Sequence, residues 1–138
     1  MPRHEKWTAV LRFYLAVGCG AAIGSLLRYL SAVVIVSMLG QSALLATAFV
    51  NIVGSFVIMS FATLTNPDGR FLIGPVGRQF VMGGLCGGFT TFSAMSLDTF
   101  ILLFEGDLTL AATYLVTVVV FSLAAAWIGY VLAARLNR

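Results

Sequence analysis

The stretch from Tyr29 to Pro67 contains no charged side chain. A helix needs about 20 mainly apolar residues to cross the hydrocarbon core of a bilayer, so this stretch can hold most of two spans and a turn. Hydrophobic residues make up 60% of the whole chain and charged residues only 9%, whereas a soluble domain is about 25% charged. We therefore predict an all-α integral membrane protein.

Turn signals divide the chain into four spans that together form a single membrane domain. The second turn signal contains Asn66, Pro67 and Gly69, residue types that interrupt helices. With 138 residues there is no room for a separate soluble domain. The predicted spans are about 11–38, 43–64, 71–104 and 108–132, and we expect a multi-pass protein of the plasma membrane, the inner membrane in a bacterium.

The third span contains a run that is unfavourable for a continuous helix. Residues 83–93 read GGLCGGFTTFS, and glycine costs about 1 kcal/mol relative to alanine inside a helix. An interruption would leave backbone N–H and C=O groups that hydrocarbon cannot satisfy, so it must be buried in protein or line a watery cavity. We predict a break near residues 87–92 and expect an ion to bind there.

Polar residues form a stripe on the second span. Thr47, Asn51 and Ser55 recur every four residues and so share one helix face. They could hydrogen-bond to other helices, at about 0.6 kcal/mol each, or they could line a track for a small hydrophilic solute. The two N–H donors of Asn51 would suit an anion. Hydroxyl residues on the fourth span give a weaker signal: Thr113, Tyr114, Thr117 and Ser122.

Two charges and one pair of glycines within the spans have several possible roles. Arg28 could reach the far interface as an anchor or attract an anion to a pore mouth. Asp98 could cap or pair locally, shape a vestibule or carry a proton, and we favour the first two roles because one acid with no obvious partner makes a poor proton relay. Gly20 and Gly24 are spaced for close packing of helix backbones, and we prefer that role for them.

The distribution of the remaining charges predicts the orientation and excludes several functions. With four spans, both termini and the second loop share the more basic side, which should face the cytoplasm. That side carries Arg3, Lys6, Arg12, Arg70, Arg78, Arg135 and Arg138, whereas the other side has Glu105, Asp107 and at most Arg28. One histidine and few acids leave little for an enzyme, and we expect the lipid bilayer, not nucleic acid, as a partner.

The motifs resemble those of the Fluc family of fluoride channels, also called CrcB. The sequence GGFTTFS at residues 87–93 is the most specific of them. GSLLRY at residues 24–29 and Val50-Asn51 followed by Gly54 agree with it, in the matching order. The resemblance covers nearly the whole chain.

Membership would imply an antiparallel, dual-topology dimer with two pores that carry fluoride out of the cell passively and reduce its toxicity. It would also imply a structural sodium ion, Na+, held by the backbone carbonyls of Gly87 and Thr90 from both subunits. Asn51 and Phe92 match pore residues of the family, and an aromatic edge is electropositive. The predicted pore set is Thr47, Asn51, Thr91, Phe92, Ser93, Met95, Tyr114 and Ser122, with Arg28 and Asp98 as vestibule or anchoring residues.

This sequence departs from the family pattern in three respects. Met95 replaces the second pore phenylalanine, and Val118 stands where some relatives carry a serine. Methionine lacks a rigid positive edge, so altered conductance is expected. The lopsided flanking charge raises the hypothesis of a two-gene heterodimer, although we favour a homodimer.

Three other functions remain as alternatives. A small multidrug-type exporter would need a carboxylate in the first span, and residues 11–38 contain none. A proton-coupled fluoride transporter could use Asp98. A scaffold subunit would conduct no ion with any partner.

Overall fold

The computed structural model describes residues 3–67 and 69–137, with side chains from residue 7 onward, and every regular element in that part of the chain is a helix. Two segments, labelled η, are π-helical turns within longer rods. The elements are α1 (Arg3–Ala32), η1 (Val33–Met38), α2 (Ala43–Leu64), α3 (Pro75–Gln79), η2 (Phe80–Cys86), α4 (Gly87–Phe89), α5 (Phe92–Phe104) and α6 (Leu108–Leu136).

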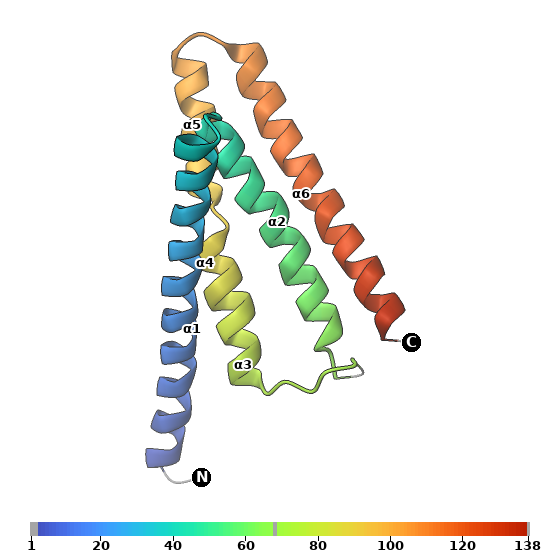
Figure 1. The fold of residues 1–138 in the computed structure, drawn as a ribbon. Coiled ribbons are helices and arrows are strands. Elements are labelled where there is room, and N and C mark those ends of the chain that lie inside the picture. Colours follow the sequence, from blue (N-terminus) through green and yellow to red (C-terminus); the bar gives the residue numbers. More distant parts are fainter. Residues whose placement is uncertain (1–2, 68, 138) are drawn as a thin grey trace.

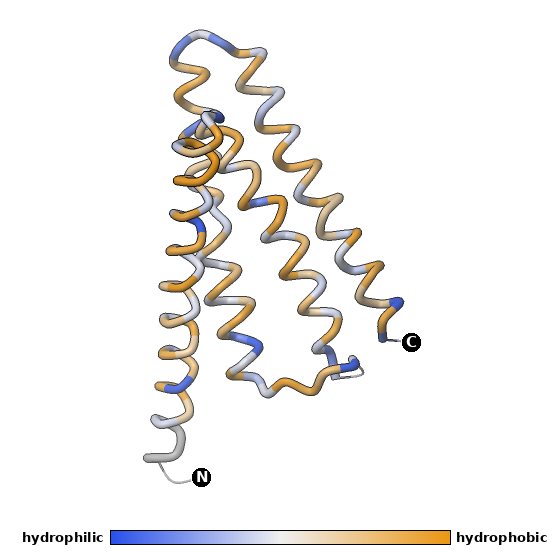
Figure 2. The backbone as a smooth tube through the Cα atoms, viewed as in Figure 1, coloured by the Kyte–Doolittle hydropathy of each residue, from blue (hydrophilic) through white to orange (hydrophobic). Residues whose placement is uncertain are grey.

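The elements combine into four rods that are long and apolar enough to cross a membrane. These rods are Trp7–Met38, Ala43–Leu64, Pro75–Phe104 and Leu108–Leu136. Apolar residues line the rods, while polar residues concentrate in the connections at both ends (Figure 2). The predicted all-helical chain with four spans is therefore confirmed.

Both termini and the connection between α2 and α3 lie at one end of the bundle, and the two other connections lie at the opposite end (Figure 1). The first end thus gathers Arg70, Arg78 and Arg135, as the charge pattern predicts. Of the other charges expected on this side, Arg138 and the side chains of Arg3 and Lys6 lie outside the described residues.

The third helix begins four residues after Phe71, near which the sequence predicts the start of the third span. The helix begins at Pro75, which occupies the first helical turn. The N–H of Phe71 instead donates to the carbonyl of Leu64 over 3.1 Å, and this contact folds the segment back against the end of α2. Proline suits the first turn of a helix because the amide it lacks would have no partner there.

Glycines let α1 approach the third rod closely. A Cβ at Gly20 would lie 2.9 Å from the amide nitrogen of Leu85, and one at Gly24 would lie 2.8 Å from that of Phe89. From the other side, a Cβ at Gly84 would lie 2.9 Å from the Cα of Gly20. The packing role predicted for Gly20 and Gly24 is confirmed, because no side chain fits between these backbones.

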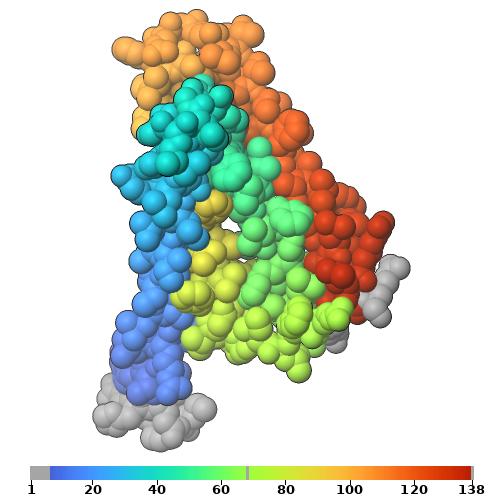
Figure 3. Space-filling view, viewed as in Figure 1, coloured from blue at the N-terminus to red at the C-terminus, as the bar shows by residue number. Residues whose placement is uncertain are grey.

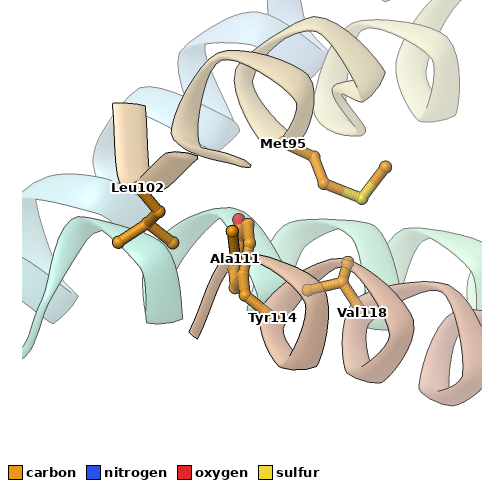
Figure 4. Packing of buried hydrophobic residues seen from close by; sticks show 5 residues of the cluster. All are labelled: Met95, Leu102, Ala111, Tyr114 and Val118. Atoms are coloured by element: carbon orange, nitrogen blue, oxygen red, sulfur yellow. The ribbon is translucent and has the colours of Figure 1, made fainter. Parts of the chain in front are cut away.

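The other half of the bundle packs around α6. A cluster of buried side chains joins α5 to α6, and its members are Met95, Leu102, Ala111, Tyr114 and Val118. Figure 4 shows Met95 and Val118 at one end of this cluster and Leu102 at the other. Leu44 and Ala48 of α2 pack against the cluster. The cluster fixes α5, and thereby the far side of the break, relative to α2 and α6.

Candidate functional site

The third rod is interrupted at two residues. Thr90 has φ −80° and ψ 160°, and Thr91 has φ −152° and ψ 110°, so both are extended between α4 and α5. The break is narrower than the predicted 87–92, because Gly87, Gly88 and Phe89 are helical. Gly88 packs directly against the backbone of Ala21 on α1, where a Cβ would not fit, whereas Gly87 makes no such close contact.

The side chain of Asn51 holds the break from α2. Its Oδ1 accepts the N–H of Thr91 over 2.7 Å, and its Nδ2 donates to the carbonyl of Thr91 over 2.9 Å. The Thr91 hydroxyl then accepts the N–H of Ala94 over 3.1 Å and so caps α5. It also lies 3.2 Å from the hydroxyl of Ser93. One residue of α2 thus satisfies both backbone groups of Thr91.

The break leaves the carbonyl groups of Gly87 and Thr90 without the hydrogen bonds that they would accept in a continuous helix. In a continuous helix the N–H of Thr91 would bond to the carbonyl of Gly87, and that of Ala94 to the carbonyl of Thr90. Both donors are engaged elsewhere, with Asn51 and with the Thr91 hydroxyl. By contrast, the Gly88 carbonyl accepts a hydrogen bond from Ser25 of α1 over 3.5 Å.

Gly87 and Thr90 are the residues for which the family resemblance implies sodium contacts. Carbonyl oxygens suit hard cations, and unwound carbonyls at membrane depth coordinate cations in other membrane proteins. The donor set therefore fits a sodium ion, although contact with sodium stays a prediction. The described residues include no group of three or more His, Cys, Asp or Glu side chains that could hold a metal.

A cavity of about 330 Å³ lies beside the break. It brings together four predicted pore residues and both predicted sodium-binding residues. The space-filling view shows a small opening between the η2–α4 segment and α2 (Figure 3). The lining residues are Asn51, Ser55, Ile58, Cys86, Gly87, Thr90, Phe92, Met95, Val118, Val119, Ser122 and Leu123.

Ser122 is a polar residue of this cavity. Its hydroxyl oxygen is buried and has no hydrogen-bond partner among the described residues. A buried hydroxyl without a partner costs free energy.

Thr47 lies away from this cavity. It lines a second, smaller cavity of about 200 Å³ together with Arg28 and Thr91. Thr47 also lies beside the Tyr114 hydroxyl, which donates to Oδ2 of Asp98 over 3.0 Å. The predicted pore residues thus divide into a group at the break and a group nearer the 39–42 turn.

Several candidate residues face outward from the single chain. Phe92 is 76% exposed although it lines the edge of the cavity. Ser93, Thr113 and Thr117 are exposed as well. An exposed aromatic ring beside a break in a membrane helix requires either lipid or another protein surface against it.

Sequence analysis missed the apolar part of the lining. Ile58 follows Asn51 by seven residues and Ser55 by three, a spacing that places all three on one helix face. Extending the stripe on the second span would therefore have found Ile58. Cys86 also lines the cavity, and nothing in its local sequence indicates that position.

The chain resembles known proteins along most of its length. The family described as "CrcB-like protein, Camphor Resistance (CrcB)" matches residues 15–130. A protein of Brucella abortus biovar 1 named fluoride-specific ion channel FluC 3 is 62% identical over 136 residues, which cover 99% of each chain. One of Bradyrhizobium diazoefficiens named fluoride-specific ion channel FluC 1 is 44% identical over 134 residues, 97% of this chain and 92% of the relative. Together with its four spans, these matches show that the chain is a multi-pass membrane protein of the CrcB family.

Proposed function

We propose that the protein is a fluoride-selective channel through which cytoplasmic fluoride leaves passively, so that fluoride toxicity is reduced. The observation that carries the proposal is the cavity beside the broken span, in a chain 62% identical over nearly its full length to a protein named fluoride-specific ion channel. The lining is mainly apolar, and the groups in it that could contact a small anion are the Asn51 amide, the serine hydroxyls and the Phe92 ring.

Fluoride is small and strongly hydrated, and removing an ion from water requires replacement donors. Asn51 keeps one N–H of its amide beyond the one that it donates to Thr91. The Ser122 hydroxyl has no other partner in the described chain. The electropositive edge of Phe92 can meet an anion without binding it tightly. Conduction needs sites of this moderate strength, whereas a ring of fixed cations would retain the ion.

A second subunit completes the pore in this proposal, in an antiparallel, dual-topology dimer. Phe92, 76% exposed in the single chain, would lie against the partner. The homodimer is the favoured form. The concentration of arginines at one end supports the heterodimer as the alternative, because such a bias fixes one orientation in the membrane.

A structural sodium ion at the dimer centre belongs to the same proposal. The Gly87 and Thr90 carbonyls of each subunit would hold it, since their helical donors are engaged elsewhere. When bound, sodium supplies positive charge that balances these converging oxygens. The chain itself keeps the carbonyls oriented and excludes competing hydrogen-bond donors.

Fluoride efflux from liposomes tests the function. The protein, expressed alone, is reconstituted into vesicles loaded with fluoride, and efflux is followed with a fluoride-selective electrode while chloride efflux serves as the control. We expect rapid fluoride efflux with little chloride efflux. Comparable chloride efflux would contradict the proposal. A preparation without flux would exclude the homodimer, and absence of flux after co-expression with a related subunit from the same genome would exclude the channel.

A further inference from the structure

We propose that Asn51 is a positioning residue for the cation site, in addition to any contact that it makes with fluoride in the pore. This inference rests on the proposed sodium site at the break. It joins two parts of the site that the family resemblance treats separately, the pore asparagine and the sodium-binding carbonyls.

Asn51 takes the hydrogen-bond donor that the Gly87 carbonyl would have in a continuous helix. Oδ1 of Asn51 takes the N–H of Thr91, which would otherwise bond to Gly87. The same bond orients the Thr90 carbonyl, because that carbonyl shares a peptide plane with the Thr91 N–H. Nδ2 fixes the Thr91 carbonyl, in the next peptide plane, at 2.9 Å. Removing this side chain would free the Thr91 N–H to return to Gly87, so the continuous helix would compete with the break.

Only an amide of this length performs both tasks, because it carries a donor and an acceptor on one carbon. A carboxylate would keep the acceptor and lose the donor. A serine is too short to replace an amide that reaches both the N–H and the carbonyl of Thr91. Thr91 itself is 7% exposed, so water cannot readily replace the lost partner.

Gly54, one turn after Asn51 on α2, leaves space for the Thr90 side chain at the break. A Cβ at Gly54 would collide with the methyl carbon of Thr90 and would lie 3.3 Å from the ring of Phe89. The Thr90 side chain therefore occupies the space that Gly54 leaves open. Asn51 and Gly54 together form a cradle on α2 for Thr90 and Thr91.

The test measures sodium binding through thermal unfolding and does not depend on fluoride flux. Purified protein in detergent is heated at increasing sodium concentration, with N-methyl-D-glucamine keeping the ionic strength constant. A ligand that binds only the native state raises the unfolding temperature according to its concentration and affinity. We expect a sodium-dependent rise for the unaltered protein.

Asn51→Leu removes both hydrogen bonds at similar volume, and we expect its apparent sodium affinity to fall at least tenfold. Gly54→Ala leaves the Asn51 amide in place but displaces Thr90, and it should also weaken the sodium response. Ser55→Ala is the matched control. Ser55 lies on the same helix face and lines the same cavity, and its variant should respond to sodium like the unaltered protein.

A normal sodium response in Asn51→Leu would overturn the inference, as would an equal loss in Ser55→Ala. If Asn51→Leu cannot be purified in folded form, Gly54→Ala decides the matter, and an unchanged sodium response there overturns the inference. Unaltered protein that conducts fluoride in vesicles but shows no sodium response would end this inference and leave the channel function standing.

Discussion

The hydroxyl of Tyr114 on α6 donates a hydrogen bond to Oδ2 of Asp98 on α5, over 3.0 Å. The acid thus has a partner 16 residues away along the chain, and this contact favours local pairing among the roles considered for Asp98. Both side chains belong to the group near the 39–42 turn, together with Thr47. Asp98 therefore helps to fix the packing of α5 on α6.

The first prediction concerns Asp98→Asn. The asparagine oxygen can still accept the Tyr114 hydroxyl, so the contact survives without the negative charge. We expect passive fluoride efflux from vesicles to stay within about threefold of the unaltered protein, about 0.6 kcal/mol of barrier. We also expect a pH gradient to drive no fluoride uptake in either protein.

A proton-coupled transporter would behave differently, because its pH-driven flux would be present in the unaltered protein and lost in Asp98→Asn. Tyr114→Phe serves as the structural comparison. It removes the hydrogen bond between Tyr114 and Asp98 while leaving the acid in place. It therefore reports what this contact alone contributes to stability and flux.

The second prediction joins the two departures from the family pattern. Met95 and Val118 belong to one buried cluster and are 4% and 2% exposed. The residues expected from the family, phenylalanine and serine, are respectively larger and smaller than those found here. Met95→Phe alone should overpack the cluster and destabilise the protein by about 1–3 kcal/mol, whereas adding Val118→Ser should return part of that loss.

A double-mutant cycle of thermal unfolding measures this coupling, which should lie within the 0.5–3 kcal/mol that contacting residues show. Strict additivity of the two changes would mean that the substitutions are unrelated. Fluoride efflux from the same four proteins then shows whether conductance follows the aromatic ring or the packing.

The third prediction concerns the contact between α1 and the third rod. A methyl group at Gly24 would collide with the carbonyl of Leu85 and approach the Phe89 amide to 2.8 Å. Gly24→Ala should therefore push the two rods apart and destabilise the protein by about 1–3 kcal/mol. Gly18→Ala on the same helix is the control, because nothing lies within 4 Å of its added Cβ. Equal unfolding temperatures for the two variants would refute close packing at Gly24.

Local chemistry was enough to predict the four spans and two of their three connections, while the connection between α2 and α3 extends to Pro75 instead of ending near Phe71. Gly40 and Gly106 end helices at φ 63° and 86°, conformations that favour glycine. The width of the break was not predictable in this way. Glycine propensity alone argues against helix at 87–88, but the contact of Gly88 with Ala21 of α1 decides the outcome, and that contact joins distant parts of the sequence.

The hydrogen bonds from Asn51 that hold the break could not be predicted from the sequence either. Asn51 and Thr91 lie 40 residues apart, and no spacing rule links a span-two stripe to a backbone group on span three. Similarly, Asn137 donates to the Thr63 carbonyl over 2.8 Å and accepts the Arg70 N–H over 3.0 Å. Such long-range hydrogen bonds depend on the packed fold. A sequence pattern can therefore indicate that a polar residue is important, but it cannot identify the residue's hydrogen-bond partner.

The fourth prediction separates a pore role for Ser122 from a structural one. The hydroxyls of Ser122 and Ser60 are both buried without a partner in the described chain, but only Ser122 lines the cavity at the break. Replacing either by alanine removes an unsatisfied polar group, so neither variant should lose thermal stability. Because Ser122 can donate to a passing anion, Ser122→Ala should slow fluoride efflux by about tenfold, about 1.4 kcal/mol of barrier, whereas Ser60→Ala should leave it unchanged. Equal efflux from the two variants would remove Ser122 from the ion path, since their burial and lack of partners are matched and only their positions differ.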